Sequence, residues 1–225
     1  MIRLFIPDTL PDVSHNEVLR YAGYRKSAQP DTDTLQHLLE LSLPHIQGRI
    51  CYDFFPVCIE DHLDMIDLGF AGLSSHSLCQ LLADSKQVVL FAATLGLDFD
   101  RIVARTAKTS SYDAWILHAI GAERVEALAD AFETTLRGQG YDLTRRFSPG
   151  YGDVPLTLQR EVFSALDCPR KIGLTLTETL LMSPSKSVTA LAGIRSGAYD
   201  ESPGHSTHKC TSCTLSNCSL RDSRE

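Results

Sequence analysis

The sequence lacks the signatures by which most catalytic and membrane-spanning proteins are recognised. It has no G-x-G-x-x-G loop, no P-loop, no H-E-x-x-H zinc motif and no G-x-S-x-G nucleophile elbow. Its longest apolar run, VVLFAATLGL from Val88 to Leu97, is too short to span a bilayer. The sequence therefore predicts neither an enzyme with its own nucleophile nor a protein that crosses a membrane.

Positive charge is also scarce. The chain has 21 Lys and Arg against 28 Asp and Glu, a formal net charge of −7, and no basic cluster is interleaved with aromatic residues. This balance argues against nucleic acid or an anionic membrane surface as the main partner. The N-terminal MIRLFIPDTLPD reaches acid and proline too early for a secretory signal, so we expect a cytoplasmic protein.

The seven cysteines fall into two groups. Four lie apart in apolar surroundings, where a free thiol behaves as a small hydrophobic side chain: Cys51, Cys58, Cys79 and Cys168. In a cytoplasmic chain, a metal or redox role suits the remaining three better than a disulfide.

Those three cysteines, Cys210, Cys213 and Cys218, have a C-x2-C-x4-C spacing that could converge on zinc or an iron–sulfur cluster. Such sites normally take four protein ligands, and His205, His208 or Cys168 could be the fourth. The alternative is a tail whose cysteines are incidental. We expect 1–197 to form one domain and 198–225 to form a flexible linker and cysteine-containing tail.

Hydrophobic periodicity predicts an α+β fold rather than a regular βαβ alternation. Capping signals and apolar spacing place helices at 14–24, 31–43, 75–83, 97–108, 111–137 and 155–166. Strands are expected at 50–59, where Pro56 would favour an edge or a bulge, and at 88–95, which reads as buried. The alternating KIGLTLTETLLM and the segment 187–194 predict a hairpin around a hydroxyl-rich turn.

The segment RRFSPGYGDVP, 145–155, is the best candidate for a ligand site. Arg146 could hold a carboxylate through two parallel hydrogen bonds, and Gly150 would allow close approach of the backbone. Tyr151 offers an aromatic face and a hydroxyl. Asp153 is expected to cap the following helix, whose N-terminus could hold an anion. A plain loop between two helices is the alternative.

Acidic residues outside this segment are weaker candidates for ligand binding. Glu178, in LTETLLMSPSKS, could accept a hydrogen bond from a hydroxyl or ammonium group, although a solvated strand residue would look the same. Glu123 and Glu126, on the long helix, are expected to face solvent or the rim of a pocket.

A run of motifs closely resembles the activation domain of cobalamin-dependent methionine synthase. The R-x-x-P-G-Y signature corresponds to Arg146, Pro149, Gly150 and Tyr151. An L-T-E-S-like strand, 176–179, and a Met-x-Pro turn, 182–184, follow it, and the Ala/Glu-rich helix before it is also similar. The specific resemblance covers 112–197, and the first 110 residues match only in general character.

The resemblance implies a single C-shaped α+β domain with a twisted antiparallel sheet and flanking helices. It also implies S-adenosylmethionine (AdoMet) as the ligand. The predicted AdoMet-binding residues are Arg146, Ser148, Pro149, Gly150, Tyr151, Glu178 and Ser183. Phe147 and Ser148 stand where the long synthases tend to have Pro and Ala, which predicts a pocket that differs in detail.

The implied role is reactivation: AdoMet remethylates cobalamin that has oxidised to the cob(II) form, with one electron from a flavodoxin-like or other donor. No D-x-H-x-x-G cobalamin motif is present, so we expect a stand-alone form that acts on a methionine synthase core or another corrinoid protein. One alternative is a metal or iron–sulfur redox protein that reduces a corrinoid protein through its tail. Another is a docking module that has lost ligand binding.

Overall fold

The computed structural model describes residues 1–24, 32–60 and 64–195. The predicted linker and tail, with Cys210, Cys213 and Cys218, lie outside the described residues, so the expected boundary near residue 197 and the metal site stay predictions. Within the described part of the chain, no helix is long and apolar enough to cross a membrane.

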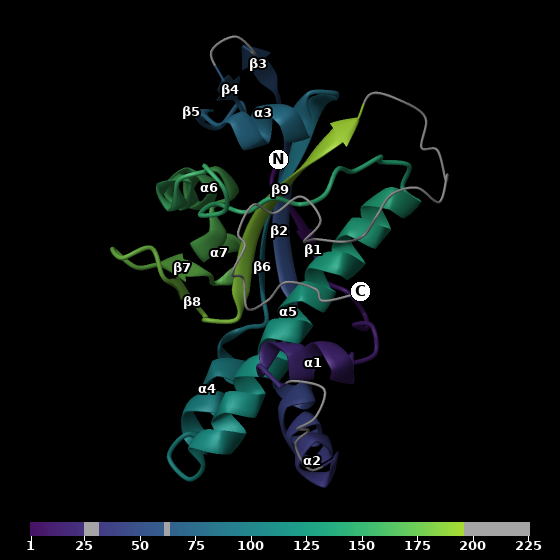
Figure 1. The fold of residues 1–225 in the computed structure, drawn as a ribbon, viewed down its shortest axis with the longest axis vertical. Coiled ribbons are helices and arrows are strands. Elements are labelled where there is room, and N and C mark those ends of the chain that lie inside the picture. The colour runs from purple at the N-terminus through teal and green to yellow at the C-terminus, as the bar shows by residue number, and fades with distance from the viewer. Residues whose placement is uncertain (25–31, 61–63, 196–225) are drawn as a thin grey trace.

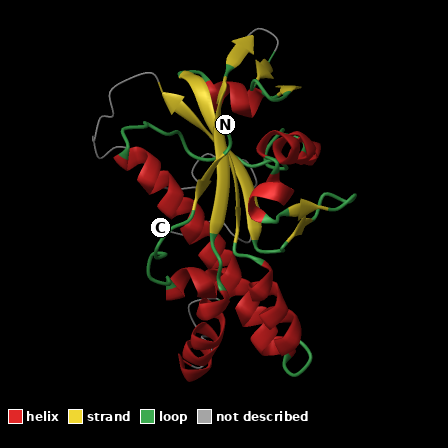
Figure 2. Ribbon diagram, turned by 180° about the vertical axis from the view of Figure 1, so that it is seen from behind, coloured by secondary structure: helices red, strands yellow, loops and turns green. Residues whose placement is uncertain are grey.

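Helices and strands occur in mixed order, as Figures 1 and 2 show. The α-helices are α1 (His15–Tyr21), α2 (Thr32–Ser42), α3 (His76–Leu82), α4 (Leu97–Thr106), α5 (Ser111–Gly138), α6 (Gln159–Leu166) and α7 (Cys168–Ile172), with 3-10 turns η1 (Leu43–His45) and η3 (Leu156–Leu158). The strands are β1 (Arg3–Phe5), β2 (Arg49–Pro56), β3 (Cys58–Glu60), β4 (Met65–Asp67), β5 (Gly72–Ser74), β6 (Ser85–Thr94), β7 (Thr175–Leu176), β8 (Met182–Ser183) and β9 (Ser187–Arg195).

The central sheet has four antiparallel strands in the order β1-β2-β6-β9. Smaller sheets are formed by β3-β4-β5 and by β7-β8. In Figure 1 the small sheet β3-β4-β5 and α3 lie at one end of the molecule, and α1, α2 and α4 lie at the other. The predicted α+β class and antiparallel sheet are confirmed.

Strand β6 is buried on both faces. Val89, Phe91 and Ala93 belong to one hydrophobic cluster, whereas Val88 and Leu90 belong to the other. Because side chains alternate along a strand, a strand covered on both sides must be apolar at every position. This explains the continuous apolar run, and the predicted buried strand is confirmed.

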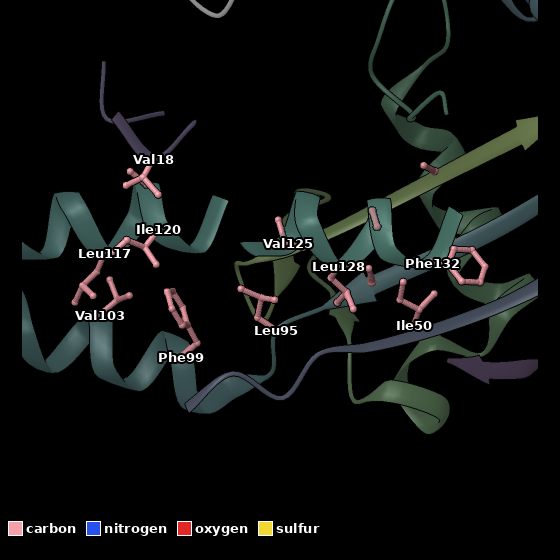
Figure 3. Packing of buried hydrophobic residues seen from close by; sticks show 14 of the residues in the cluster. Val18, Ile50, Leu95, Phe99, Val103, Leu117, Ile120, Val125, Leu128 and Phe132 are labelled. Atoms are coloured by element: carbon pink, nitrogen blue, oxygen red, sulfur yellow. The ribbon is translucent and has the colours of Figure 1, made fainter. Parts of the chain in front are cut away.

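The first cluster lies between the sheet and α5. Figure 3 shows it extending along α5, from Ile120 beside Val18 of α1 to Phe132 beside Ile50 of β2. The centroid of the Phe132 ring lies 5.2 Å from the centroid of the Phe91 ring on β6. This helix therefore fixes the sheet at one end and the helices α1, α2 and α4 at the other.

The second cluster lies on the opposite face of the sheet, under α3, α6 and α7. Leu90 of β6 and Leu191 of β9 form a register pair and pack with Val162 and Leu166 of α6. Cys168 of α7 is also fully buried here, and its Sγ lies 3.9 Å from Sγ of Cys51. Cys58, in contrast, is exposed.

Helix starts follow the predicted capping signals. Ser14 Oγ accepts from the backbone N–H of Glu17 at 3.4 Å, and Ser110 Oγ accepts from that of Asp113 at 3.1 Å. Each bond satisfies one of the unpaired donors of a helix N-terminus. The predicted starts of α1 and α5 are confirmed.

The predicted hairpin is wrong. Residues 168–172 form helix α7, which ends at Gly173 with φ +70°, and β7 pairs with β8 rather than with β9. A turn closes β7–β8, with the backbone N–H of Thr177 donating to the Leu181 carbonyl at 2.9 Å. Strand β9 pairs instead with β6, far away in sequence, and this pairing places its apolar residues in the two hydrophobic clusters on either face of the sheet.

Pro56 does not move its strand to the edge. Strand β2 lies between β1 and β6, but β1 pairs only with Ile50 to Tyr52. Pro56 is the last residue of β2, beyond the reach of β1, so its missing N–H costs no bond to that neighbour.

Candidate functional site

The segment before the Pro-Gly turn runs along the edge strand β9. Isolated antiparallel bridges join Leu143 to Ile194 and Phe147 to Leu191. Phe147 and Leu191 exchange two backbone hydrogen bonds of 2.8 and 2.9 Å. Phe147 packs against the second cluster, so the extended backbone directs the preceding residue, Arg146, to the opposite side, toward α5.

Three carboxylates of α5 surround the Arg146 guanidinium. Nη1 donates to Asp130 at 2.5 Å and to Glu133 at 2.7 Å, and Nη2 donates to Glu126. Positions 126, 130 and 133 share one face of a helix because they are four and three residues apart. The Arg146 side chain is only 12% exposed, so these ion pairs are partly shielded from water.

This environment fixes the charge of Arg146. Burial by itself would lower the pKa of the guanidinium, but the nearby carboxylates of Glu126, Glu133 and Asp130 outweigh it and raise the pKa. Arg146 is therefore a permanent cation whose position is set by α5.

Arg146 retains hydrogen-bonding capacity. A guanidinium has five N–H donors, and three are used by the carboxylates. Among the described residues the Nε–H and one Nη2–H make no hydrogen bond. Adjacent Nε and Nη2 donors can hold a carboxylate side-on through two parallel bonds.

The exposed carboxylate of this group borders a cleft. The side chains of Glu133, Glu126 and Asp130 are 8%, 32% and 56% exposed, respectively. Asp130 lies in the lining of a cleft of about 360 Å³, which is formed by Thr9, Leu10, Pro11, Asp130, Ala131 and Thr134. The cleft therefore lies between the N-terminal segment and α5, and Asp130 is its charged lining residue.

A buried ion pair holds the N-terminal segment beside α5. Arg124 donates to the Pro11 carbonyl at 2.6 Å and to the Asp12 carbonyl at 3.1 Å, and it is paired with Glu123. Glu123 also accepts from the backbone N–H of Ser14 at 3.0 Å. The expectation that Glu123 faces solvent or a pocket rim is wrong, because its carboxylate is buried in this connection.

The Pro-Gly-Tyr loop has a tight, exposed geometry. Gly150 has φ +89°, which favours glycine, and a Cβ there would lie 3.1 Å from Leu156 Cδ1. The Gly150 N–H donates to the Val154 carbonyl at 3.0 Å, which closes the loop. Pro149 is buried, Ser148 is half-buried and Tyr151 is exposed, so the tyrosine ring is available to a ligand or partner.

Asp153 does not cap the helix that follows it. Its carboxylate accepts from Ser75 Oγ at 2.6 Å and from the backbone N–H of Ser77 at 3.2 Å, at the start of α3. The 3-10 turn η3 precedes α6, and no side chain caps either one. Desolvation alone would raise the pKa of Asp153, but the hydrogen bonds from Ser75 and Ser77 lower it.

The remaining predicted ligand residues lie on the β7–β8 unit. Glu178 is exposed in the turn, and its carbonyl oxygen accepts from Arg160 of α6 at 3.2 Å. Ser183 is exposed on β8, and its carbonyl oxygen accepts from Thr175 Oγ1 at 3.2 Å. In the described part of the chain, no hydrogen bond or ion pair joins Glu178 or Ser183 to the Arg146 group.

The structure therefore brings Arg146 together with Glu126, Asp130 and Glu133, and only Arg146 and Glu126 were singled out from the sequence. Asp130 and Glu133 were not selected, although their spacing from Glu126 along a helix is a recognisable signal. Only the fold could show that this face of α5 meets Arg146, since the two segments are joined by the turn after Gly138. Among the described residues, no group of three or more His, Cys, Asp or Glu side chains is arranged to hold a metal ion.

Comparison with known proteins identifies the class of domain. The family model described as "Vitamin B12 dependent methionine synthase, activation domain" matches residues 77–200, which is 124 of the 225 residues. The chain belongs to this family. Its match begins at α3 and spans α5, Arg146 and the Pro-Gly-Tyr loop.

Structure comparison supports the fold. The chain is similar to a protein described as "Crystal Structure of the MetH Reactivation Domain bound to AdoHcy", with a TM-score of 0.55, 17% sequence identity, and coverage of 88% of this chain and 80% of that one. A comparison with curated protein sequences found no match. The structural match extends to the first part of the chain, which the family model leaves out.

Proposed function

We propose that this chain binds AdoMet at the Arg146 site and serves the reductive remethylation of cob(II)alamin carried outside its 225 residues. The observation that carries the proposal is the position of Arg146 in a chain of this family: a fixed cation in contact with Asp130, a lining residue of a cleft, with two donors that no described residue uses. The solved relative is described as bound to AdoHcy, the demethylated form of AdoMet, which adds support.

The chemistry of the site fits the amino-acid end of AdoMet. The Nε–H and free Nη2–H of Arg146 would hold the carboxylate, and the exposed carboxylate of Asp130 would accept from the ammonium group. Tyr151 presents an aromatic face to a cationic or planar group. Ser148, Pro149 and Gly150 would contribute backbone contacts, and Glu178 and Ser183 stay proposed contacts from the β7–β8 unit.

The residues of this chain would act by positioning. When bound, AdoMet supplies the methyl group that is transferred to the corrinoid. Arg146 is held by α5 and the loop by its bond to Val154, so both are ordered before the ligand arrives. Holding reactants in place in this way accelerates a reaction without a protein nucleophile.

Calorimetric titration with AdoMet tests the proposal. We expect saturable binding, weakened at least about tenfold in an Arg146→Lys variant, which keeps the positive charge but loses the planar fork. Arg101→Lys, at an exposed ion pair on α4, is the matched control and should bind as the unmodified chain does. Absence of AdoMet binding, with and without a cobalamin-loaded methionine synthase core, would refute the proposal.

An absorbance assay tests the reactivation step. The chain is mixed with a cobalamin-loaded core, AdoMet and a flavodoxin-like or chemical electron donor. Conversion of cob(II)alamin to methylcobalamin should depend on the chain and on Arg146. Conversion that is unchanged without the chain would contradict the role.

The cysteine pattern favours a second, compatible role. Cys210, Cys213 and Cys218 would hold zinc or an iron–sulfur cluster, and the cluster would deliver an electron to a corrinoid protein. Anaerobic purification followed by metal analysis and absorption spectroscopy tests it, with a variant that lacks 198–225 as the control. A metal-free protein whose truncated form is fully active would rule this role out.

A further inference from the structure

We propose that Asp153 is a positioning residue for the AdoMet site: its bonds to the start of α3 hold the Pro-Gly-Tyr loop in the form that presents Tyr151 to the ligand. The inference rests on the proposed function, since it assumes that Tyr151 contacts AdoMet. It gives the site a second support, because Arg146 is held by α5 and the loop by α3, which packs on the opposite face of the sheet.

The base of the loop is fixed by its own backbone. The Gly150 N–H donates to the Val154 carbonyl and the Val154 N–H donates to the Tyr151 carbonyl, each at 3.0 Å. The Val154 side chain is buried in the second cluster. These contacts fix the loop at Val154 and leave its tip, Tyr151 and Gly152, exposed.

The Tyr151 ring depends on the backbone for its direction. Tyr151 is 67% exposed, so packing against the protein does little to hold the ring. The next residue, Gly152, has φ +55°, and glycine has more backbone freedom than any other residue. A restraint directly after Gly152 is therefore needed to keep the tip in one form.

Asp153 supplies that restraint. Its carboxylate accepts from Ser75 Oγ at 2.6 Å and from the Ser77 N–H at 3.2 Å. A Cβ on Gly152 would lie 3.3 Å from Ser77 Oγ, so the start of α3 lies directly against the tip of the loop. Two bonds from two different residues fix the Asp153 side chain in one orientation.

Helix α3 is itself firmly held. The Ser75 hydroxyl donates its proton to Asp153 and accepts from the Leu78 N–H at 3.1 Å, so it uses both of its functions. Leu78 and Leu82 are fully buried in the second cluster. Asp153 therefore ties the tip of the loop to the core of the protein.

The expected effect on binding follows from the fraction of chains with an ordered loop. The apparent affinity of a ligand falls in proportion to the fraction of the protein in the binding-competent form. Loss of one hydrogen bond to a charged group changes such an equilibrium by about tenfold. We therefore expect AdoMet binding to weaken by about three- to tenfold when the Asp153 bonds are broken.

Calorimetric titration with AdoMet tests the inference. Asp153→Asn keeps the size of the side chain but leaves one oxygen in place of two, and it should bind AdoMet about three- to tenfold more weakly. Asp64→Asn is the matched control, because it makes the same change at a carboxylate that bonds to His76, also at the start of α3, at 3.0 Å. It should bind AdoMet as the unmodified chain does.

Hydrogen–deuterium exchange of the ligand-free chain reports on the loop directly. The amides of Gly150 and Val154 are hydrogen-bonded and should exchange slowly in the unmodified chain. Their exchange should become faster in Asp153→Asn and stay unchanged in Asp64→Asn.

A double-mutant cycle with Tyr151→Ala separates positioning from a general structural role. If Asp153 acts through Tyr151, Asp153→Asn should weaken AdoMet binding little further once the tyrosine ring has been removed. A general loss of structure would lower the affinity by the same factor with and without the ring. Circular dichroism of each variant checks that it is folded.

The outcomes distinguish the inference from the proposed function. If AdoMet does not bind, the proposed function fails and the inference fails with it. If binding depends on Arg146 but is equally tight in Asp153→Asn and the unmodified chain, the proposed function stands and the positioning role is refuted. The same factor of weakening in both tyrosine backgrounds would also refute it.

Discussion

The two faces of the central sheet carry different chemistry. The face under α5 combines an apolar cluster with buried or partly buried ion pairs, Glu123–Arg124 and the group around Arg146. The face under α6 and α7 is apolar, with the thiols of Cys51 and Cys168 at its centre. Both faces bury apolar side chains, and the α5 face also holds the Arg146 ion-pair group, of which Asp130 lines a cleft. Packing therefore stabilises both sides of the sheet, whereas the proposed ligand site lies on one side.

Removing one partner of the buried ion pair should have the largest effect. A Glu123→Gln variant leaves Arg124 buried without its counter-charge and weakens the attachment of Ser14 and Pro11 to α5. We expect the free energy of unfolding to decrease by about 3–5 kcal/mol. Urea unfolding measures it, and Glu40→Gln on the exposed face of α2 is the control, expected to change little.

Two leucine truncations compare the packing of the faces directly. Leu128 on α5 and Leu166 on α6 are both fully buried, one in each cluster. Each Leu→Ala change should cost about 2–5 kcal/mol in the free energy of unfolding, through lost burial and the cavity left behind. Denaturant unfolding with both variants measures this. A loss below about 1 kcal/mol on either side would contradict the view that both faces are packed cores.

The bond between Asp153 and α3 should have a smaller, pH-dependent effect. Because the folded state lowers the pKa of Asp153, its stabilising contribution is present above the ordinary carboxyl pKa and is lost as the pH falls through the lower, folded-state value. At neutral pH, Asp153→Asn removes an anion from the start of α3 and should therefore lower the free energy of unfolding by about 0.3–1 kcal/mol. The difference between variant and unmodified chain should decrease as the pH falls below about 4. A difference that is constant between pH 3 and pH 7 would refute this explanation.

The helices and the main strands could be predicted because their signals are local. Ser14, Ser110 and the apolar spacing of α5 determine where helices begin and which side is buried, whatever the rest of the chain does. The pairing of β9 could not be predicted in this way. Its partner β6 lies about a hundred residues away, and a local hairpin satisfies the same alternation.

The candidate site was partly predictable for a related reason. Arg146 and the Pro-Gly-Tyr turn were selected by motif and family resemblance, and the structure places Arg146 against Asp130, which lines a cleft. The partners Asp130 and Glu133 depend on how α5 crosses the sheet, which no local pattern specifies. Asp153 was assigned to the wrong helix because α3 is distant in sequence but adjacent in the fold.

The central claim is that a ligand carboxylate binds the fixed guanidinium of Arg146. The most direct measurement is the affinity for AdoMet of the unmodified chain and of Arg146→Lys, by calorimetry at neutral pH and low salt. The account predicts saturable binding that weakens at least about tenfold in the variant while its thermal unfolding stays cooperative. Equal affinity in the two proteins, or no binding in either, would contradict it.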